Sequence, residues 1–168
     1  MSKFNYNRRK THEVNIGGIP LGGDNPIRVQ SMTSTSTMDT EGSVAQIKRI
    51  VDAGGEYVRL TAQGVREAEN LGEISARLRA DGVTTPLVAD IHFNPRAAFA
   101  AASRVEKVRI NPGNFVDPGR VFKKIEYTDE EYAAELQRIE TALVPFLDLC
   151  REHSTAIRIG VNHGSLSD

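Results

Sequence analysis

Pro86-Leu-Val-Ala-Asp-Ile-His-Phe-Asn-Pro95 is followed closely by Val105-Glu-Lys-Val-Arg-Ile-Asn-Pro-Gly-Asn114, and the two stretches share one pattern. Each is a short apolar run that ends in polar side chains. This pattern is typical of a buried parallel strand that ends at an active site. Alternate residues of a strand point to the same face, so Asp90 and His92 share a face, as do Arg109 and Asn111. We expect these two strands to gather their polar ends at one edge of a sheet.

Three further stretches, residues 27–32, 56–61 and 156–162, follow the same pattern and give five expected strands. Apolar residues recur at helical spacing between the strands, and the predicted helices are 42–53, 65–80, 96–103 and a long helix that starts at Thr128 and reaches Cys150. This alternation predicts an α/β fold with a parallel sheet. No G-x-G-x-x-G motif follows the first strand, which favours a (β/α)8 TIM-type barrel over a dinucleotide-binding sheet.

The predicted domain organisation has two parts. Residues 1–11 are polar and are expected to be a flexible N-terminus, whereas residues 12–168 are expected to form the N-terminal part of a TIM-type barrel. This part opens with a β-hairpin at residues 12–21, turned by Gly17-Gly18, which is interpreted as a cover over the bottom of the barrel. A complete barrel needs roughly 250 residues, so a truncated barrel is expected, with two exposed strand edges.

The composition excludes several classes of protein. The chain has 168 residues, 39% of them hydrophobic, and a formal net charge of −1, so nothing indicates a nucleic-acid partner. No apolar run approaches the ~20 residues of a membrane span, and the N-terminus lacks the apolar core of a signal peptide. The single cysteine, Cys150, fits a reducing, cytoplasmic environment and lies on the apolar stripe of its helix. It is interpreted as a core thiol.

Three arginines, Arg59, Arg109 and Arg158, lie near the C-terminal ends of their strands. Guanidinium groups bind phosphate oxygens with two parallel hydrogen bonds, so three of them at one barrel mouth predict an anionic site for a phosphate or diphosphate. The alternative is that each arginine pairs with a neighbouring acid, for example Glu56, Glu106 or Asp90.

Asp90 and His92 could bind a metal, act as an acid–base pair or orient a hydroxylated substrate. Two residues do not make a metal site, so no metal ligand is assigned, and no catalytic residue is assigned either. The expected substrate-binding residues are Arg59, Asp90, His92, Arg109, Asn111, Arg158, Asn162 and Ser165. The hydroxyl-rich segment 33–40 is interpreted as a flexible, solvated loop above the first strand.

Five phrases of the sequence, in order, carry a resemblance to a known family: residues 29–33, 57–61, 88–94, 108–114 and 157–166. They resemble the 4-hydroxy-3-methylbut-2-enyl diphosphate synthases, the IspG/GcpE family, over nearly the whole chain from about residue 9. The ending at residues 162–168 is more similar to the longer form of the family, which is found in plants and some bacteria and carries an inserted domain.

The resemblance implies an oxidoreductase of non-mevalonate isoprenoid biosynthesis (the MEP pathway) that reductively opens 2-C-methyl-D-erythritol 2,4-cyclodiphosphate. In that family the N-terminal barrel holds the substrate, and a C-terminal domain holds a 4Fe–4S cluster on three cysteines and a glutamate. It also implies a homodimer, a ferredoxin or flavodoxin-type electron donor, and contacts of Arg59, Arg109 and Arg158 with the diphosphate. His92, Asn111, Asn162 and Asp90 would line the same pocket.

The departure of the sequence from the family is large, because the later barrel residues and the cluster domain are absent from these 168 residues. Cys150 is the only cysteine, so these residues cannot assemble an iron–sulfur cluster, and the chain alone is expected to be inactive. Two other interpretations stay open. One is a pterin-binding barrel enzyme of the dihydropteroate synthase type, and the other is a non-catalytic phosphate-binding or assembly module that pairs its exposed strand edges with a second copy.

Overall fold

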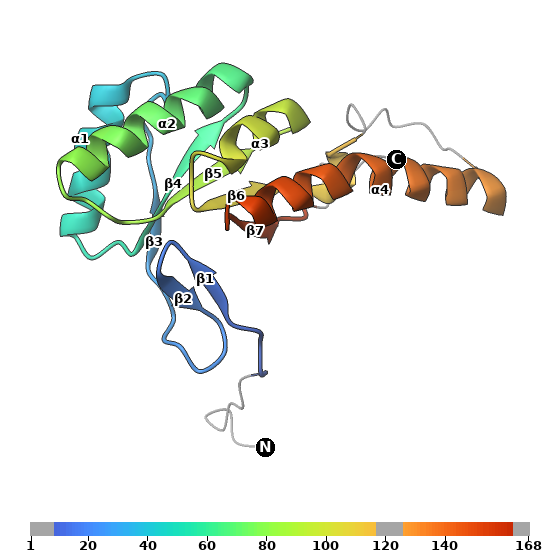
Figure 1. The fold of residues 1–168 in the computed structure, drawn as a ribbon, viewed down its shortest axis with the longest axis horizontal. Coiled ribbons are helices and arrows are strands. Elements are labelled where there is room, and N and C mark those ends of the chain that lie inside the picture. Colours follow the sequence, from blue (N-terminus) through green and yellow to red (C-terminus); the bar gives the residue numbers. More distant parts are fainter. Residues whose placement is uncertain (1–8, 117–125, 163–168) are drawn as a thin grey trace.

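The predicted parallel sheet is present in the computed structural model, which describes residues 9–116 and 126–162 (Figure 1). Its five strands lie in sequence order, each parallel to the next: β3 (Gln30–Met32), β4 (Tyr57–Ala62), β5 (Leu87–Ile91), β6 (Lys107–Ile110) and β7 (Ala156–Ile159). An α-helix lies between each strand of this sheet and the next along the chain: α1 (Thr40–Asp52), α2 (Val65–Ala80), α3 (Pro95–Ala102) and α4 (Asp129–Glu152). This order is that of a TIM-type barrel, as expected.

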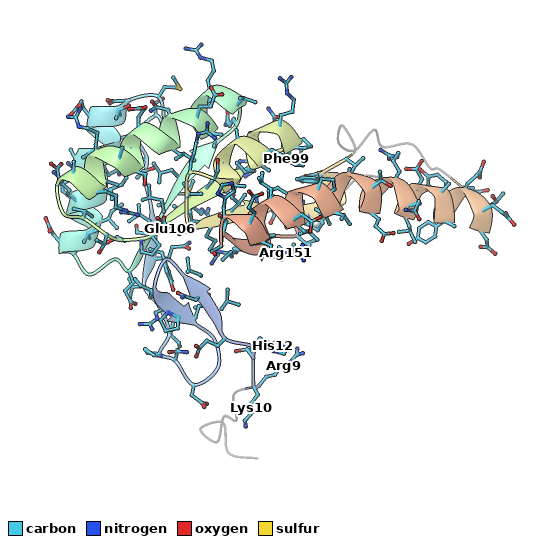
Figure 2. The ribbon with its side chains drawn as sticks, in the orientation of Figure 1. Arg9, Lys10, His12, Phe99, Glu106 and Arg151 are labelled. Carbon is cyan, nitrogen blue, oxygen red and sulfur yellow. The ribbon has the colours of Figure 1, made fainter. Side chains whose placement is uncertain are left out.

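The helices cover one face of the sheet. Fully buried side chains of the strands, among them Val58, Leu60, Ala89 and Val108, form the main core with residues of all four helices. Phe146 of α4 joins this core through edge-on contact with Phe99 of α3, with ring centroids 5.6 Å apart. Phe99 is labelled on α3 in Figure 2. Apolar burial of this kind is the main favourable term for the fold.

The opposite face of the sheet, here called the inner face, carries the charged residues. The register aligns Thr61 with Asp90, Asp90 with Arg109, and Arg109 with Arg158, so these four side chains form one row across the strands β4 to β7. Arg59 and Lys107 lie on the same face, two residues earlier in their strands. The inner face therefore corresponds to the interior of the barrel, and its C-terminal end corresponds to the mouth.

The predicted hairpin covers the other end of the inner face. Its strands are β1 (Val14–Ile16) and β2 (Ile19–Leu21), joined by Gly17 and Gly18 with positive φ. Ile16 packs with Tyr57 and Val88 of the inner face, and the Tyr57 hydroxyl donates a hydrogen bond to the Ile19 carbonyl at 2.9 Å. Residues 9–11 are exposed and without regular structure, and the flexibility of residues 1–11 stays a prediction.

Helix starts follow the local sequence signals. The Asp39 side chain accepts a hydrogen bond from the backbone N–H of Gly42 and so caps α1. Asn94 caps α3 ahead of Pro95, and the Thr128–Glu131 capping box starts α4. These caps fix where each helix begins, and the cap of α3 also fixes the chain immediately after β5.

The interpretation of residues 33–40 as a flexible, solvated loop is wrong in part. Thr33 and Thr37 are buried, and the Thr37 hydroxyl donates a 2.6 Å hydrogen bond to the Thr61 carbonyl. The backbone N–H groups of Ser34 and Thr35 both donate to the Gln46 side chain of α1. Hydroxyl groups that look solvated in the sequence instead tie this segment to β4 and α1.

The apolar stripe of α4 is only partly buried. Cys150 and Phe146 lie in the core, whereas Leu147 is exposed. Tyr132 and Leu136 are exposed because the N-terminal half of α4 extends beyond the rest of the fold (Figure 1). None of the helices in the described residues combines the length and the apolar character that a membrane span requires.

Cys150 is confirmed as a core thiol. It is 1% exposed, and burial raises the pKa of its thiol from 9.0 to about 11. Iodoacetamide at pH 8 is therefore expected to alkylate the folded chain about 100-fold more slowly than the urea-unfolded chain, because only the thiolate reacts. Rapid alkylation of the folded chain, measured by mass spectrometry with the Cys150→Ala variant as a blank, would contradict the assignment of Cys150 to the core.

The raised pKa of Cys150 also predicts a pH dependence of stability. As the pH rises from about 9 to 11, the thiol ionises in the unfolded chain before it ionises in the native chain, so the free energy of unfolding should fall across that range.

Candidate functional site

Asp90 is the centre of the candidate site. It lies near the C-terminal end of β5 on the inner face and is only 2% exposed. Arg109 of β6 donates a hydrogen bond from Nη1 to its Oδ1 at 3.2 Å, and Nε of Arg59 from β4 lies 3.4 Å from its Oδ2. One buried carboxylate is thus shared by guanidinium groups from the strands on either side.

Arg109 is held from two directions. Besides Asp90, it donates from Nη2 to the carbonyl of Gly160 at 2.9 Å, directly after β7. Gly160 leaves the space that this contact needs, because a Cβ there would overlap the Arg109 guanidinium. Arg109 is 7% exposed, so its orientation is set by the protein before any ligand arrives.

The alternative interpretation, that each arginine pairs with an acidic residue, is correct for Arg59 and Arg109, which both pair with Asp90. Arg59 also contacts the Met32 sulfur at 3.2–3.3 Å. The other two acids are taken by different partners, since Glu56 pairs with Arg28 at 2.8 Å and Glu106 with Arg79 at 2.7 Å. Arg158 is exposed and has no ion pair among residues 9–116 and 126–162. Three guanidinium groups against one carboxylate leave a local positive excess.

A cavity of about 220 Å³ lies at this end of the sheet. It brings together four of the expected residues: His92, Arg109, Asn111 and Asn162. His92 is partly exposed, and its Nε2 lies 3.8 Å from Asp90 Oδ2, beyond direct hydrogen-bond distance. Arg158 does not line this cavity but borders a separate hollow between the hairpin and β7, and Arg59 does not line it either, although it pairs with Asp90.

Asn111 and the residues that follow it form one wall of the cavity. The Asn111 side chain accepts a hydrogen bond from the backbone N–H of Gly113 at 3.1 Å and so caps the short helix η1 (Pro112–Asn114). Asn114 is buried and lines the same cavity. Ser165 lies outside the described residues, so its place at the site stays a prediction.

Two residues at or near the site were missed by reasoning from the sequence. Lys107 is buried on the inner face with its Nζ 5.7 Å from the centre of the Tyr57 ring, and its pKa is lowered by burial and, second, by Arg158. Its parity with Arg109 was the available signal. Phe93 follows His92, lines the cavity and is more than half exposed. Its position between a strand and a capping Asn was the available signal.

Nothing among the described residues fits an iron–sulfur cluster or another bound metal. No three His, Cys, Asp or Glu side chains in this part of the chain group together as ligands. The single thiol, Cys150, is in the core with a raised pKa, whereas a cluster ligand is a thiolate. Within residues 9–116 and 126–162, the charged groups of the site are therefore suited to contacts with an anion and not to ligation of a cluster.

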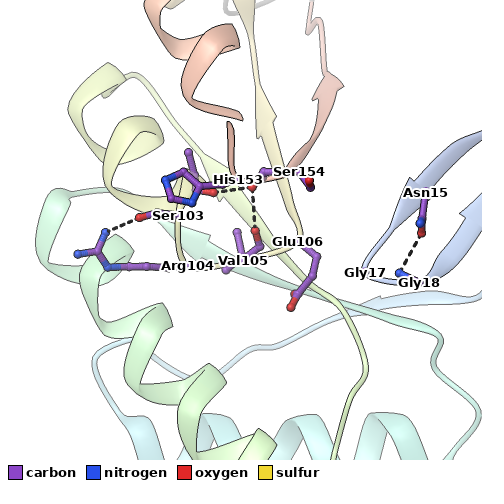
Figure 3. Close-up of a pocket in the computed structure, with 11 residues that line it drawn as sticks. Asn15, Gly17, Gly18, Ser103, Arg104, Val105, Glu106, His153 and Ser154 are labelled. Carbon is purple, nitrogen blue, oxygen red and sulfur yellow. Dashed lines mark hydrogen bonds between the residues drawn. The ribbon is translucent and has the colours of Figure 1, made fainter. Parts of the chain in front are cut away.

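A larger hollow of about 590 Å³ lies at the opposite end of the sheet (Figure 3). It is bordered by the turn at Gly17-Gly18 and by the loops that precede β6 and β7, which carry Arg104 and His153. None of the expected site residues lines it. Functional residues of parallel barrels gather at the C-terminal ends of strands, so the hollow at the N-terminal ends is not the candidate site.

The strand order, the helix-covered outer face and the polar C-terminal edge define a TIM-type barrel protein with a cationic strand-end site. The comparison with known families is specific: residues 11–168 match the GcpE TIM-barrel domain. The chain belongs to this family.

Similar proteins agree with this assignment. The chain is 70% identical over 168 residues to a 4-hydroxy-3-methylbut-2-en-1-yl diphosphate synthase (flavodoxin) of Bacteroides fragilis and 52% identical over 167 residues to one of Akkermansia muciniphila. It is 45% identical over 167 residues to a chloroplastic ferredoxin form from Oryza sativa subsp. japonica. These alignments cover 99–100% of this chain but only 27%, 28% and 22% of the respective relatives.

Among solved structures, a dihydropteroate synthase of Xanthomonas albilineans superposes with a TM-score of 0.50 at 18% identity, covering 90% of this chain and 65% of that one. At this identity the likeness concerns the fold alone. It therefore supports the barrel architecture, and it gives no support to the pterin-binding interpretation.

Proposed function

We propose that this chain is the substrate-binding barrel portion of a 4-hydroxy-3-methylbut-2-enyl diphosphate synthase and that its ligand is 2-C-methyl-D-erythritol 2,4-cyclodiphosphate. The observation that carries the proposal is the arrangement around Asp90, which holds Arg59 and Arg109 at the mouth while Arg158 stays exposed in the same region. Family membership supports the identity of the anion, because relatives that contain this barrel are named as diphosphate synthases.

The roles of individual groups follow from their geometry. Arg109 presents a fixed guanidinium at the wall of the cavity, and Arg158 adds a second positive charge from the adjacent strand. Asn111 and Asn162 offer amide groups to phosphate or hydroxyl oxygens, and Ser165 would add a hydroxyl. His92 lies where it can hydrogen-bond a substrate hydroxyl, with Asp90 behind it. These residues bind and orient the substrate.

The complete reaction needs parts beyond this chain. Reductive ring opening consumes two electrons, and in the family a 4Fe–4S cluster supplies them. We infer that its ligands lie in the remaining part of a longer protein, that the barrel alone is inactive, and that the active form is a homodimer. The relatives are named as flavodoxin and ferredoxin forms of the synthase, which favours one of these two proteins as the electron donor.

Calorimetry on a full-length protein of the family, with these 168 residues as its N-terminal part, tests the proposal. We expect micromolar or tighter binding of the cyclic diphosphate and no measurable binding of a pterin. The affinity should fall with added salt, because the main contacts are ionic. If circular dichroism shows that the protein is folded but calorimetry detects no binding of the cyclic diphosphate, the proposed function is refuted.

A further inference from the structure

Phe93 has a backbone conformation that side chains of its kind rarely adopt. It connects β5 to α3 with φ 54°, and only Ser154 shares a positive φ among the other non-glycine residues that the structure describes. The chain is fixed on both sides, by the ladder of β5 before it and by the Asn94 cap of α3 after it. A positive φ is sterically unfavourable for phenylalanine, whereas glycine or asparagine adopts it readily.

The conformation has a clear effect on the ring. A hydrophobic residue directly before a helix cap often packs against the fourth residue of the helix. In α3 that residue is Ala98, which is fully buried, but the Phe93 side chain remains 57% exposed. Its ring instead lies at the wall of the cavity beside His92, with ring centroids 6.4 Å apart. Strained residues with exposed side chains are typical of ligand sites.

The other side chains of the cavity are mostly polar. Arg109, His92 and three asparagines supply charge and hydrogen bonds, and the apolar Ile91 is 4% exposed. Groups of this kind bind phosphate oxygens but cannot distinguish a carbon-bearing diphosphate from inorganic diphosphate. An exposed aromatic face can make that distinction, because it gains affinity only from carbon atoms.

We propose that Phe93 is a specificity residue that contacts the carbon skeleton of the bound cyclic diphosphate at the rim of the cavity. This inference rests on the proposed function and adds to it the group that recognises the non-phosphate part of the ligand. The positive φ at Phe93 then holds the ring over the ligand and away from α3. The phosphates are bound by the cations, and the carbon ring is bound by Phe93.

Two substitutions separate the ring from the backbone. Phe93→Asn keeps a residue that tolerates the positive φ but removes the apolar face, and Phe93→Leu keeps an apolar side chain. Calorimetry on the full-length protein should show the Asn variant binding the cyclic diphosphate about tenfold more weakly, as expected for loss of one apolar contact. Its affinity for inorganic diphosphate should be unchanged. The Leu variant should stay within about threefold of wild type for both ligands.

Tyr132→Asn is the matched control, because Tyr132 is also 57% exposed but lies on α4, away from the cavity. It should change neither affinity. The inference is overturned if Phe93→Asn leaves the affinity for the cyclic diphosphate unchanged or weakens both ligands equally. A wild-type protein that does not bind the cyclic diphosphate would instead refute the proposed function, and a wild type that binds both ligands equally would refute the role of Phe93 alone.

Discussion

Replacing Asp90 with asparagine is expected to lower the free energy of unfolding by about 3–5 kcal/mol. The carboxylate is 2% exposed and lies 3.2 Å from Arg109 and 3.4 Å from Arg59. An amide of the same shape leaves two guanidinium groups close together without a counter-charge. For a chain of this size such a loss lowers the melting temperature by roughly 10 °C, which thermal unfolding followed by circular dichroism would measure.

The control for this variant is Asp148→Asn. Asp148 also accepts a hydrogen bond from an arginine, Arg151, at 3.0 Å, but the two side chains are 57% and 84% exposed. A solvated pair of this kind contributes little, so the melting temperature should move by less than about 1 °C. Equal effects of the two substitutions would mean that Asp90 does not stabilise the arginines at the mouth.

Replacing Arg158 with methionine is expected to weaken binding of the cyclic diphosphate by roughly 10–100-fold, the loss typical of a charge-assisted contact with phosphate. The melting temperature should not change, because Arg158 is exposed and no ion pair within the described part of the chain depends on it. Arg158→Lys should recover part of the affinity, since the charge remains but the paired donors are lost. Calorimetry and thermal unfolding on the same samples provide both readings.

Arg77→Met serves as its control. Arg77 pairs with Glu41 at 2.7 Å, but this pair is on the exposed surface of α1 and α2. Removing it takes away the same charge without touching the inner face. If Arg77→Met and Arg158→Met reduced the affinity equally, the effect would come from net charge, and the assignment of Arg158 to the ligand would be wrong.

Much of the fold could be predicted from the sequence because its local signals agree with its tertiary structure. The second helix was predicted at its observed bounds, residues 65–80, since apolar spacing marks its buried stripe and Gly82 follows its end. The shared faces of Asp90 and His92 and of Arg109 and Asn111 followed from strand parity alone. Strand lengths were overestimated, because β3 pairs over only three residues, Gln30–Met32.

The partners of each side chain could not be predicted. The sequence alone did not distinguish Glu56, Glu106 and Asp90 as partners of the arginines. The register between strands decides this, because it places Asp90 between Arg59 and Arg109. The backbone conformation of Phe93 was equally hidden, because it results from β5 and the α3 cap together. Strand parity predicts which face a residue occupies, but neighbouring strands decide what it meets there.

The contact of Arg109 with the Gly160 carbonyl has a consequence for how a ligand binds. One guanidinium connects the end of β5, through Asp90, to the chain that leaves β7. An incoming anion therefore meets a donor whose rotamer is already selected, and it loses little conformational entropy in aligning it. The three strand ends should also respond together, so ligand binding should slow amide hydrogen exchange near Gly160 as well as near Asp90.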